Sequence, residues 1–185
     1  THCTSSAASD VYKRQVYQKH PNWATNKYTT DGRINTQLWD EERLTTWFDT
    51  FMPTLELRND TVAELMSDSA LVWITKYNFD GFRHDATKHI PMNFTRLLTE
   101  KIRAASDDHV YQIGETYGSD ELIASYVGSG KVDAQFNFNL YDAAFEAFTQ
   151  EGATFDRLRK ALESSLTYYG HHHLMGNISG NQDKP

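Results

Sequence analysis

Arg83 and Asp85 lie in the stretch of this chain whose residue types and spacing most directly indicate chemistry, Asp80-Gly81-Phe82-Arg83-His84-Asp85-Ala86-Thr87-Lys88-His89. On a β-strand, Gly81, Arg83 and Asp85 point to one side because successive side chains alternate. Phe82 and His84 point to the other side. A guanidinium near a carboxylate favours the ionised form of the acid. The spacing therefore predicts an aspartate held as a carboxylate at the end of a strand, ready to act as a nucleophile.

Glu115 is a second acid with a different setting. It follows the apolar, strand-like run 110–114 and has no basic residue close to it in the sequence. Partial desolvation beside other carboxylates would raise its pKa, which is what a general acid requires. The hydrolysis of a glycosidic bond generally needs one protonated and one ionised carboxyl group. Glu115 and Asp85 are therefore candidates for these two roles.

Residues 81–89 resemble the second conserved region of the α-amylase family of glycoside hydrolases, which reads much like Gly-Phe-Arg-x-Asp-Ala-x-Lys-His. The resemblance, to bacterial members of the family 13 type, covers roughly residues 50–185. It implies a retaining enzyme that cleaves α-glucosidic linkages in starch-like glucans or maltooligosaccharides through a covalent intermediate on Asp85. Glu115, in a Gly-Glu-Thr context, would be the acid/base.

The resemblance also implies roles for five further residues. Asp183 matches the third carboxylate, which hydrogen-bonds the sugar and stabilises the transition state. Arg83 matches the arginine that holds the nucleophile, and Lys88 and His89 match contacts to the sugar on the leaving-group side. Gln182 departs from the family, which usually has at this position a histidine that donates a hydrogen bond to the sugar. An amide can still donate that bond, although it cannot be protonated.

Several other functions compete with this interpretation. A transglucosylase, or a cyclodextrin- or pullulan-degrading member of the same family, would share these residues and differ in its loops. A catalytically silent relative would only bind glucan, but the three carboxylates and Arg83 are all present. A metal-dependent hydrolase would need the three adjacent histidines 171–173, which as neighbours in a loop point in different directions and have no acid or cysteine at ligand spacing. We therefore predict no metal ligand among these residues.

Calcium enters only through the family resemblance. The family carries an earlier motif, Asp-x-x-x-Asn-His, at the end of its third strand, and this chain lacks it. We expect that motif upstream of residue 1. Its asparagine is often a calcium ligand, so no cofactor is certain here and calcium is possible in the full-length protein.

Helical and strand patterns alternate along the second half of the chain. The spacing of apolar residues predicts helices over 61–76, 92–105, 120–127, 140–150 and 154–167, and strands around 81–85, 109–115, 131–138 and 174–179. Thr61 and Glu64 have the spacing of a capping box at the first of these helices. This alternation indicates βα units and a parallel sheet. With the resemblance, it predicts an α/β fold, a partial (β/α)8 TIM barrel that is incomplete at both ends, with Asp85, Glu115 and Asp183 at the C-terminal ends of strands.

Three regions divide the chain. Residues 1–15 are small and polar without periodicity, and we interpret them as a non-native, adapter-derived or disordered tail. Residues 16–52, polar and rich in aromatics, are predicted to be the end of an inserted domain or a loop region. Residues 53–185 are predicted to be the partial catalytic barrel, about strands 4 to 7. Because an unclosed barrel exposes strand edges, we expect this piece alone to be poorly folded and inactive.

Composition excludes several classes of partner. A formal net charge of −7 and a pI near 5.5 argue against nucleic acid, which binds basic surfaces. No apolar run reaches the roughly 18 residues that a membrane span needs. Cys3 is the only cysteine, so a disulfide framework is excluded. The expected partner is an α-glucan or oligosaccharide, the expected state is a monomer, and the location is unknown, with an extracytoplasmic one favoured.

Overall fold

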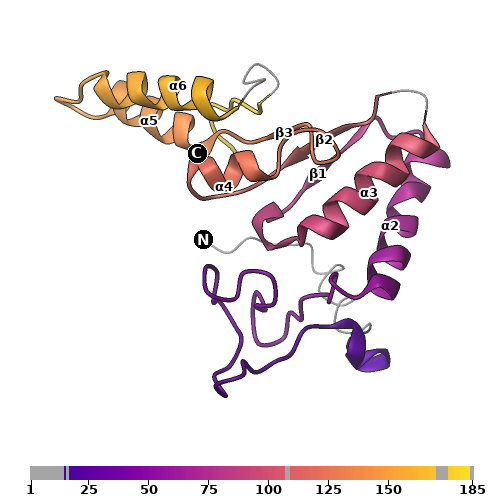
Figure 1. Ribbon diagram of the computed structural model, residues 1–185. Helices are drawn as coiled ribbons and strands as arrows, with labels where there is room; N and C mark the ends of the chain where they lie inside the picture. Colours follow the sequence, from indigo (N-terminus) through magenta and orange to yellow (C-terminus); the bar gives the residue numbers. More distant parts are fainter. Residues whose placement is uncertain (1–14, 16, 107–108, 170–174, 184–185) are drawn as a thin grey trace.

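A three-stranded parallel sheet lies at the centre of the computed structural model, which describes residues 15, 17–106, 109–169 and 175–183. Its strands follow chain order, β1 (Gly81–His84), β2 (Tyr111–Gly114) and β3 (Ala134–Gln135), as Figure 1 shows. In the register, His84 pairs with Gly114 and Gly114 with Gln135. The C-terminal ends of the three strands therefore meet at one edge of the sheet.

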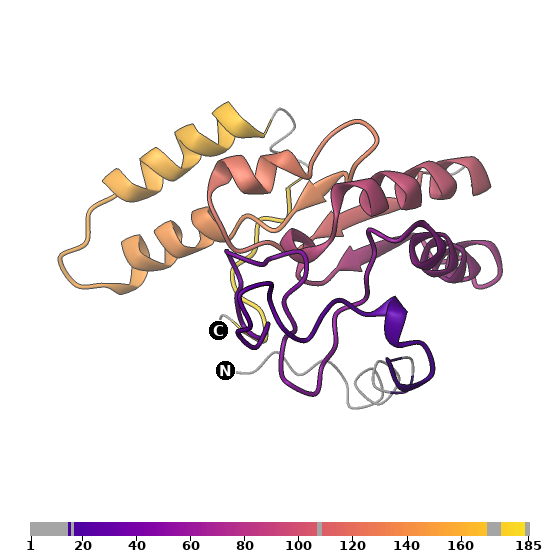
Figure 2. The ribbon, with the colours of Figure 1, turned by 60° about the horizontal axis from the view of Figure 1, so that its bottom comes forward.

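Two long helices cover one part of this sheet, α2 (Asp60–Thr75) and α3 (Met92–Ala105), the second with the bounds that the sequence predicted. They lie side by side in Figures 1 and 2. Phe94, Leu98 and Ile102 lie on one face of α3 and are buried in a cluster with apolar residues of α2. Each such side chain contributes about 1.5–3 kcal/mol when it is fully buried. This packing holds the helix pair against the outer side of β1.

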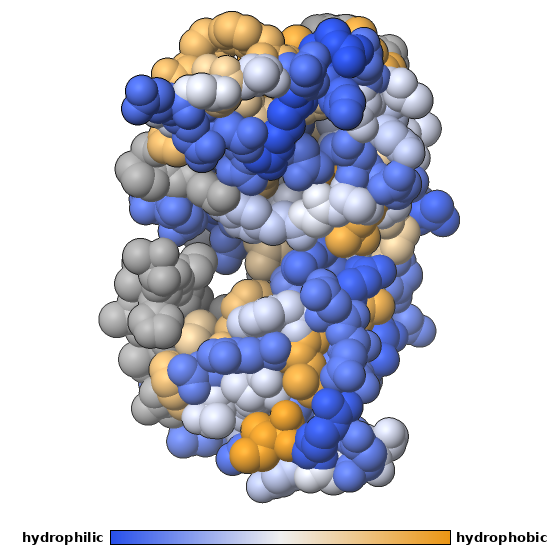
Figure 3. All heavy atoms as spheres, turned by 90° about the vertical axis from the view of Figure 1, so that its left-hand side faces the viewer, coloured by the Kyte–Doolittle hydropathy of each residue, from blue (hydrophilic) through white to orange (hydrophobic). Residues whose placement is uncertain are grey.

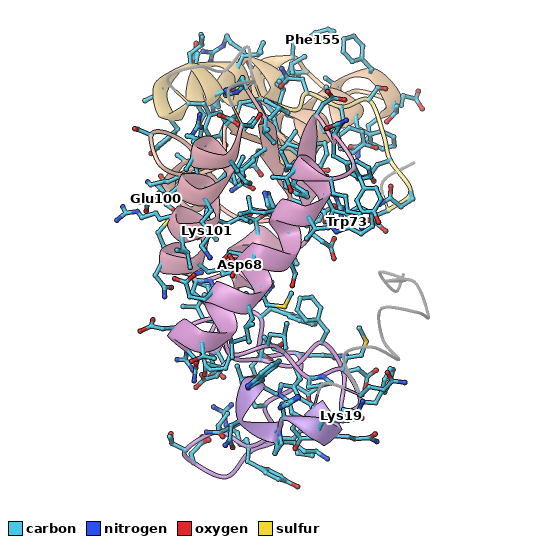
Figure 4. The ribbon with its side chains drawn as sticks, turned by 90° about the vertical axis from the view of Figure 1, so that its right-hand side faces the viewer. Lys19, Asp68, Trp73, Glu100, Lys101 and Phe155 are labelled. Atoms are coloured by element: carbon cyan, nitrogen blue, oxygen red, sulfur yellow. The ribbon has the colours of Figure 1, made fainter. Side chains whose placement is uncertain are left out.

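Lys101 connects the exposed sides of the same two helices. Its ammonium lies 2.6 Å from an oxygen of Asp68 and also contacts Glu64, both on α2. Figure 4 shows Lys101 and Asp68 facing each other across the helix pair. Exposed ion pairs stabilise proteins little. We therefore expect this contact to add little to the stability of the helix pair.

The predicted capping box of α2 is wrong. The side chain of Asn59 caps the helix instead, by accepting hydrogen bonds from the backbone N–H groups of Thr61 and Val62. The helix therefore begins at Asp60, and Thr61 lies inside its first turn. A short asparagine side chain just before the helix is well placed to satisfy two free amides.

All four predicted strands are shorter among the described residues, and the last two are reduced the most. The strand expected over 131–138 is limited to β3, because Asn137 caps α5 (Phe138–Thr149) by accepting from Leu140 N–H. Phe138 therefore enters a helix. Of the strand expected over 174–179, the described residues 175–183 keep one parallel bridge, between Gly176 and Phe136. A Cβ at Gly176 would lie 2.6 Å from a methyl carbon of Ile113 and 2.7 Å from the ring of Phe136, so a larger residue here would have to displace these side chains.

Helices α5 and α6 (Asp156–Tyr168) form a hairpin that projects beyond the sheet (Figure 1). Asp120, at the start of α4 (Asp120–Ser125), holds the hairpin. One of its oxygens accepts hydrogen bonds of 2.7 Å from Asn139 and from Tyr169, and the other accepts from Ser164. Hydrophobic residues gather over the hairpin at the top of Figure 3. None of the helices in the described ranges combines the length and the apolar character that crossing a bilayer requires.

Residues 17–58 form an extended, loop-rich segment tied by isolated bridges such as Ala24 to Leu55 and Thr36 to Trp47. Trp47 is buried, and its indole N–H donates to Thr25. The segment lies below the sheet in Figure 1 and contacts the turn η2 (Thr87–His89) that follows β1. This contact brings the loop-rich segment to the edge of the sheet that carries the predicted site.

Candidate active site

Arg83 brings two of the predicted acids together. Asp85 and Glu115 directly follow β1 and β2, whose last residues are paired. One guanidinium nitrogen of Arg83 lies 2.6 Å from an Asp85 oxygen, and another lies 2.6 Å from a Glu115 oxygen. The chain turns back immediately after Asp85, where Ala86 has the left-handed conformation, with φ 48° and ψ 45°. The structure therefore groups Arg83, Asp85 and Glu115 at the C-terminal edge of the sheet.

The two acids have opposite surroundings. The side chain of Asp85 is 47% exposed, whereas that of Glu115 is 7% exposed. Burial, with Asp85 as a neighbouring hydrogen-bonding and negatively charged group, raises the pKa of Glu115 to about 7, although Arg83 acts in the other direction. Within the described part of the chain, the second oxygen of Glu115 is buried without a hydrogen-bond partner. Glu115 can therefore hold a proton near neutral pH, while Asp85 is accessible.

Asp183 comes to the same region from the C-terminal segment. Its backbone N–H donates to the Asn181 side chain over 2.9 Å, and the Gln182 amide donates to its carboxylate over 3.2 Å. Burial, followed by the charges of Glu115 and Asp183, raises the pKa of the Tyr117 hydroxyl to about 12. Asp183 and Glu115 therefore both act on the Tyr117 hydroxyl, and the grouping of Asp183 with Asp85 and Glu115 stays a prediction.

Lys88 and His89 contact the loop-rich segment. The Lys88 ammonium lies 3.4 Å from Asp40, and Nδ1 of His89 lies 2.7 Å from the carbonyl oxygen of Arg43. The His89 ring is buried, with its edge toward two aromatic rings of residues 39–48, and burial lowers its pKa. In this structure both side chains are oriented by that segment. Their contact with a sugar stays a prediction.

No metal centre is found in the described residues, where no group of three or more histidine, cysteine, aspartate or glutamate side chains is arranged to hold an ion. The histidines 171–173 lie outside those residues. The expectation of calcium in the full-length protein rests on the upstream motif and stays a prediction.

Sequence reasoning missed three residues of the site, Thr87, Tyr117 and Asn181. Tyr117 follows Glu115 by two positions, so an extended chain directs both side chains to one side, and this spacing was a usable signal. Asn181 hydrogen-bonds Tyr117 and the backbone of Asp183. Thr87 gave no such signal, because its role depends on the pairing of two distant strands.

Two carboxyl groups of different exposure, at the C-terminal edge of a parallel sheet covered by helices, are the arrangement expected of one class of protein, the barrel-type glycoside hydrolases. Residues 4–185 match the family model described as the catalytic domain of α-amylase. The chain belongs to the α-amylase family.

Similar proteins agree with this assignment. A cyclomaltodextrinase of Geobacillus thermopakistaniensis is 28% identical over 145 residues, which cover 75% of this chain and 24% of that protein. A cyclomaltodextrin glucanotransferase of Paenibacillus macerans is 24% identical over 170 residues, or 89% of this chain and 22% of that protein. The crystal structure of an Anoxybacillus α-amylase superposes with a TM-score of 0.78 at 22% identity, covering 92% of this chain and 36% of that one.

These comparisons define the fold. The chain spans less than a quarter of the length of the two relatives and 36% of the solved amylase chain. The described sheet is thus part of a (β/α)8 barrel, and the predicted α/β class with an incomplete barrel is confirmed.

Proposed function

We propose that the protein is a retaining glycoside hydrolase that cleaves α-glucosidic linkages in starch-like glucans or maltooligosaccharides. The observation that carries this proposal is the Arg83 bridge, which holds an exposed Asp85 and a buried Glu115 with a raised pKa at one strand edge. A nucleophile must reach the substrate and be ionised, whereas an acid must keep its proton until the leaving group needs it.

The first step breaks the glycosidic bond. An Asp85 carboxylate oxygen attacks the anomeric carbon, and Glu115 gives its proton to the departing oxygen, so that a covalent glycosyl ester on Asp85 and a free sugar hydroxyl result. Arg83 then faces Glu115 as a carboxylate and stabilises it.

The second step returns the enzyme to its initial state. Glu115 takes a proton from a water molecule, and the resulting oxygen attacks the anomeric carbon and displaces the Asp85 carboxylate. Two displacements at one carbon retain its configuration. Asp183, held by Asn181, would hydrogen-bond the sugar in both transition states.

The substrate class rests on the relatives. Their names specify a cyclomaltodextrinase, a cyclomaltodextrin glucanotransferase and an α-amylase. The glucanotransferase, which aligns with 89% of this chain, favours a second candidate in which an acceptor sugar replaces the water of the second step. The complete set of Arg83 and three carboxylates argues against a relative that only binds glucan.

The first experiment measures reducing-sugar release by the full-length protein from amylose, pullulan, cyclodextrin and cellulose, beside Asp85→Asn and Glu115→Gln. We expect release from an α-glucan that falls by roughly 10³-fold or more in both variants. Asp85→Asn loses the proposed nucleophile, and Glu115→Gln loses the proposed proton donor. Product chains longer than the substrate would identify the transglucosylase. A folded protein without release from any α-glucan, or full release by Asp85→Asn, would contradict the proposal.

A further inference from the structure

Thr87 is a buried side chain that connects the two strand ends of the site. It is 1% exposed and begins the turn η2, two residues after Asp85. Its hydroxyl donates to the carbonyl oxygen of His84 over 2.9 Å and accepts from the N–H of Glu115 over 2.9 Å. Because His84 directly precedes Asp85, one hydroxyl joins the backbones of both candidate catalytic acids.

Backbone hydrogen bonds surround this hydroxyl. The Thr87 N–H donates to the Glu115 carbonyl oxygen over 2.7 Å, and the Glu115 N–H also donates to the His84 carbonyl oxygen over 2.9 Å. These bonds persist when the hydroxyl is removed, so the sheet edge keeps its connection. The hydroxyl adds a third restraint, which fixes the position of Glu115 N relative to the turn after Asp85.

The neighbouring residues leave room for the hydroxyl. A Cβ at Gly114 would lie 2.7 Å from the Thr87 hydroxyl and 2.8 Å from the side-chain oxygen of Gln135, closer than real Cβ atoms approach. A side chain at position 114 would therefore displace the hydroxyl from between the strands. The Thr87 hydroxyl therefore occupies the space that a side chain at position 114 would fill.

The separation of the two carboxyl groups matters for the reaction. A retaining glycosidase needs them about 5–5.5 Å apart, so that one attacks the carbon while the other protonates the adjacent oxygen. We propose that Thr87 is a positioning residue, whose hydroxyl sets the separation of Asp85 and Glu115; this rests on the function proposed above. Thr87 itself is buried, so its side chain is not available for contact with substrate.

A matched pair of variants in the full-length protein tests this proposal. Thr87→Ser keeps the hydroxyl, and Thr87→Ala differs from it by that single oxygen. In T87A we expect kcat to fall by about 10–100-fold with little change in KM, since misplacing a reacting group by about 1 Å costs on this order. The alkaline limb of its pH profile should move to lower pH as Glu115 becomes less buried. T87S should keep most of the wild-type kcat, and the alkaline limb of its pH profile should stay where it is in the wild type.

Three outcomes would overturn the proposal. T87A with unchanged kcat and pH profile would show that the hydroxyl sets nothing. An equal loss in T87S would assign the effect to the lost methyl group. If the wild type releases no sugar, the proposed function fails, and NMR titration of isotope-labelled Glu115 tests Thr87 separately: equal midpoints in T87A and T87S would reject the positioning role. Thr87→Val, which keeps the volume without the hydroxyl, replaces T87A should that variant not fold.

Discussion

Arg83 divides two guanidinium nitrogens between Asp85 and Glu115, and these two acids differ in their exposure to solvent. The Asp85 side chain is about half exposed to solvent. Around Glu115 the exclusion of water outweighs the attraction of Arg83, and the pKa rises to about 7. One arginine therefore contacts an exposed carboxyl group and a buried one whose pKa is raised.

The raised pKa of Glu115 predicts pH effects of definite sign. As a general acid it must be protonated, so activity should fall as pH rises through about 7. The folded pKa is above the ordinary value of 4.5, so the stability that this group contributes below pH 4.5 is lost as pH rises toward about 7. Thermal unfolding of the full-length wild type should show this loss relative to Glu115→Gln. If the melting temperatures of the wild type and Glu115→Gln keep a constant difference from pH 4.5 to about 7, the raised pKa of Glu115 is contradicted.

Helix α2 offers a test of its N-terminal cap. Asn59→Ala should destabilise the full-length protein by about 1 kcal/mol, because two amides at the start of the helix lose their acceptor. Thr61→Ala, which would disrupt the capping box expected from the sequence, should change stability by less than about 0.5 kcal/mol. Chemical denaturation of both variants measures the difference. Equal losses of stability in the two variants would contradict the Asn59 cap and support the capping box.

The α5–α6 hairpin depends on Asp120. Burial alone would raise the pKa of this carboxyl, but hydrogen bonds from Ser164, Asn139 and Tyr169 outweigh burial and lower it. The stability it contributes is therefore present above its ordinary pKa and lost as pH falls through the lowered one. Asp120→Asn should cost about 1 kcal/mol at neutral pH, since partial exposure screens the charge. Melting curves of Asp120→Asn beside Glu151→Gln, at neutral and acid pH, test this: a cost that does not shrink on acidification would contradict it.

At the scale of the whole molecule, local patterns predicted the fold where one signal dominates. Helix α3 has a regular apolar stripe, and its bounds in the structure are the ones that the sequence predicted. The strand expected to continue to Phe138 ended early because Asn137 caps a helix, and a cap competes with strand alternation over the same residues. The grouping of Asp85 and Glu115 followed from two strands that end side by side.

The surroundings of the site could not be predicted in this way. Thr87 acts through the pairing of β1 with β2, and Arg43 orients His89 from a position 46 residues earlier in the chain. Such contacts depend on packing between distant segments, which a linear pattern does not contain. The three-region division of the chain, a monomeric state and an extracytoplasmic location stay predictions.

The attachment of Asp183 differs from that of the other two acids, and this difference bears on synthesis. Asp85 and Glu115 follow adjacent, hydrogen-bonded strands, whereas the segment before Asp183 joins β3 through the bridge at Gly176. The ribosome adds roughly 70 residues between Glu115 and Asp183, which takes about 4–14 s at its usual speed. Asp85, Glu115 and the arginine between them are therefore synthesised before Asp183, and the third carboxylate is the last of the three to become available to the site.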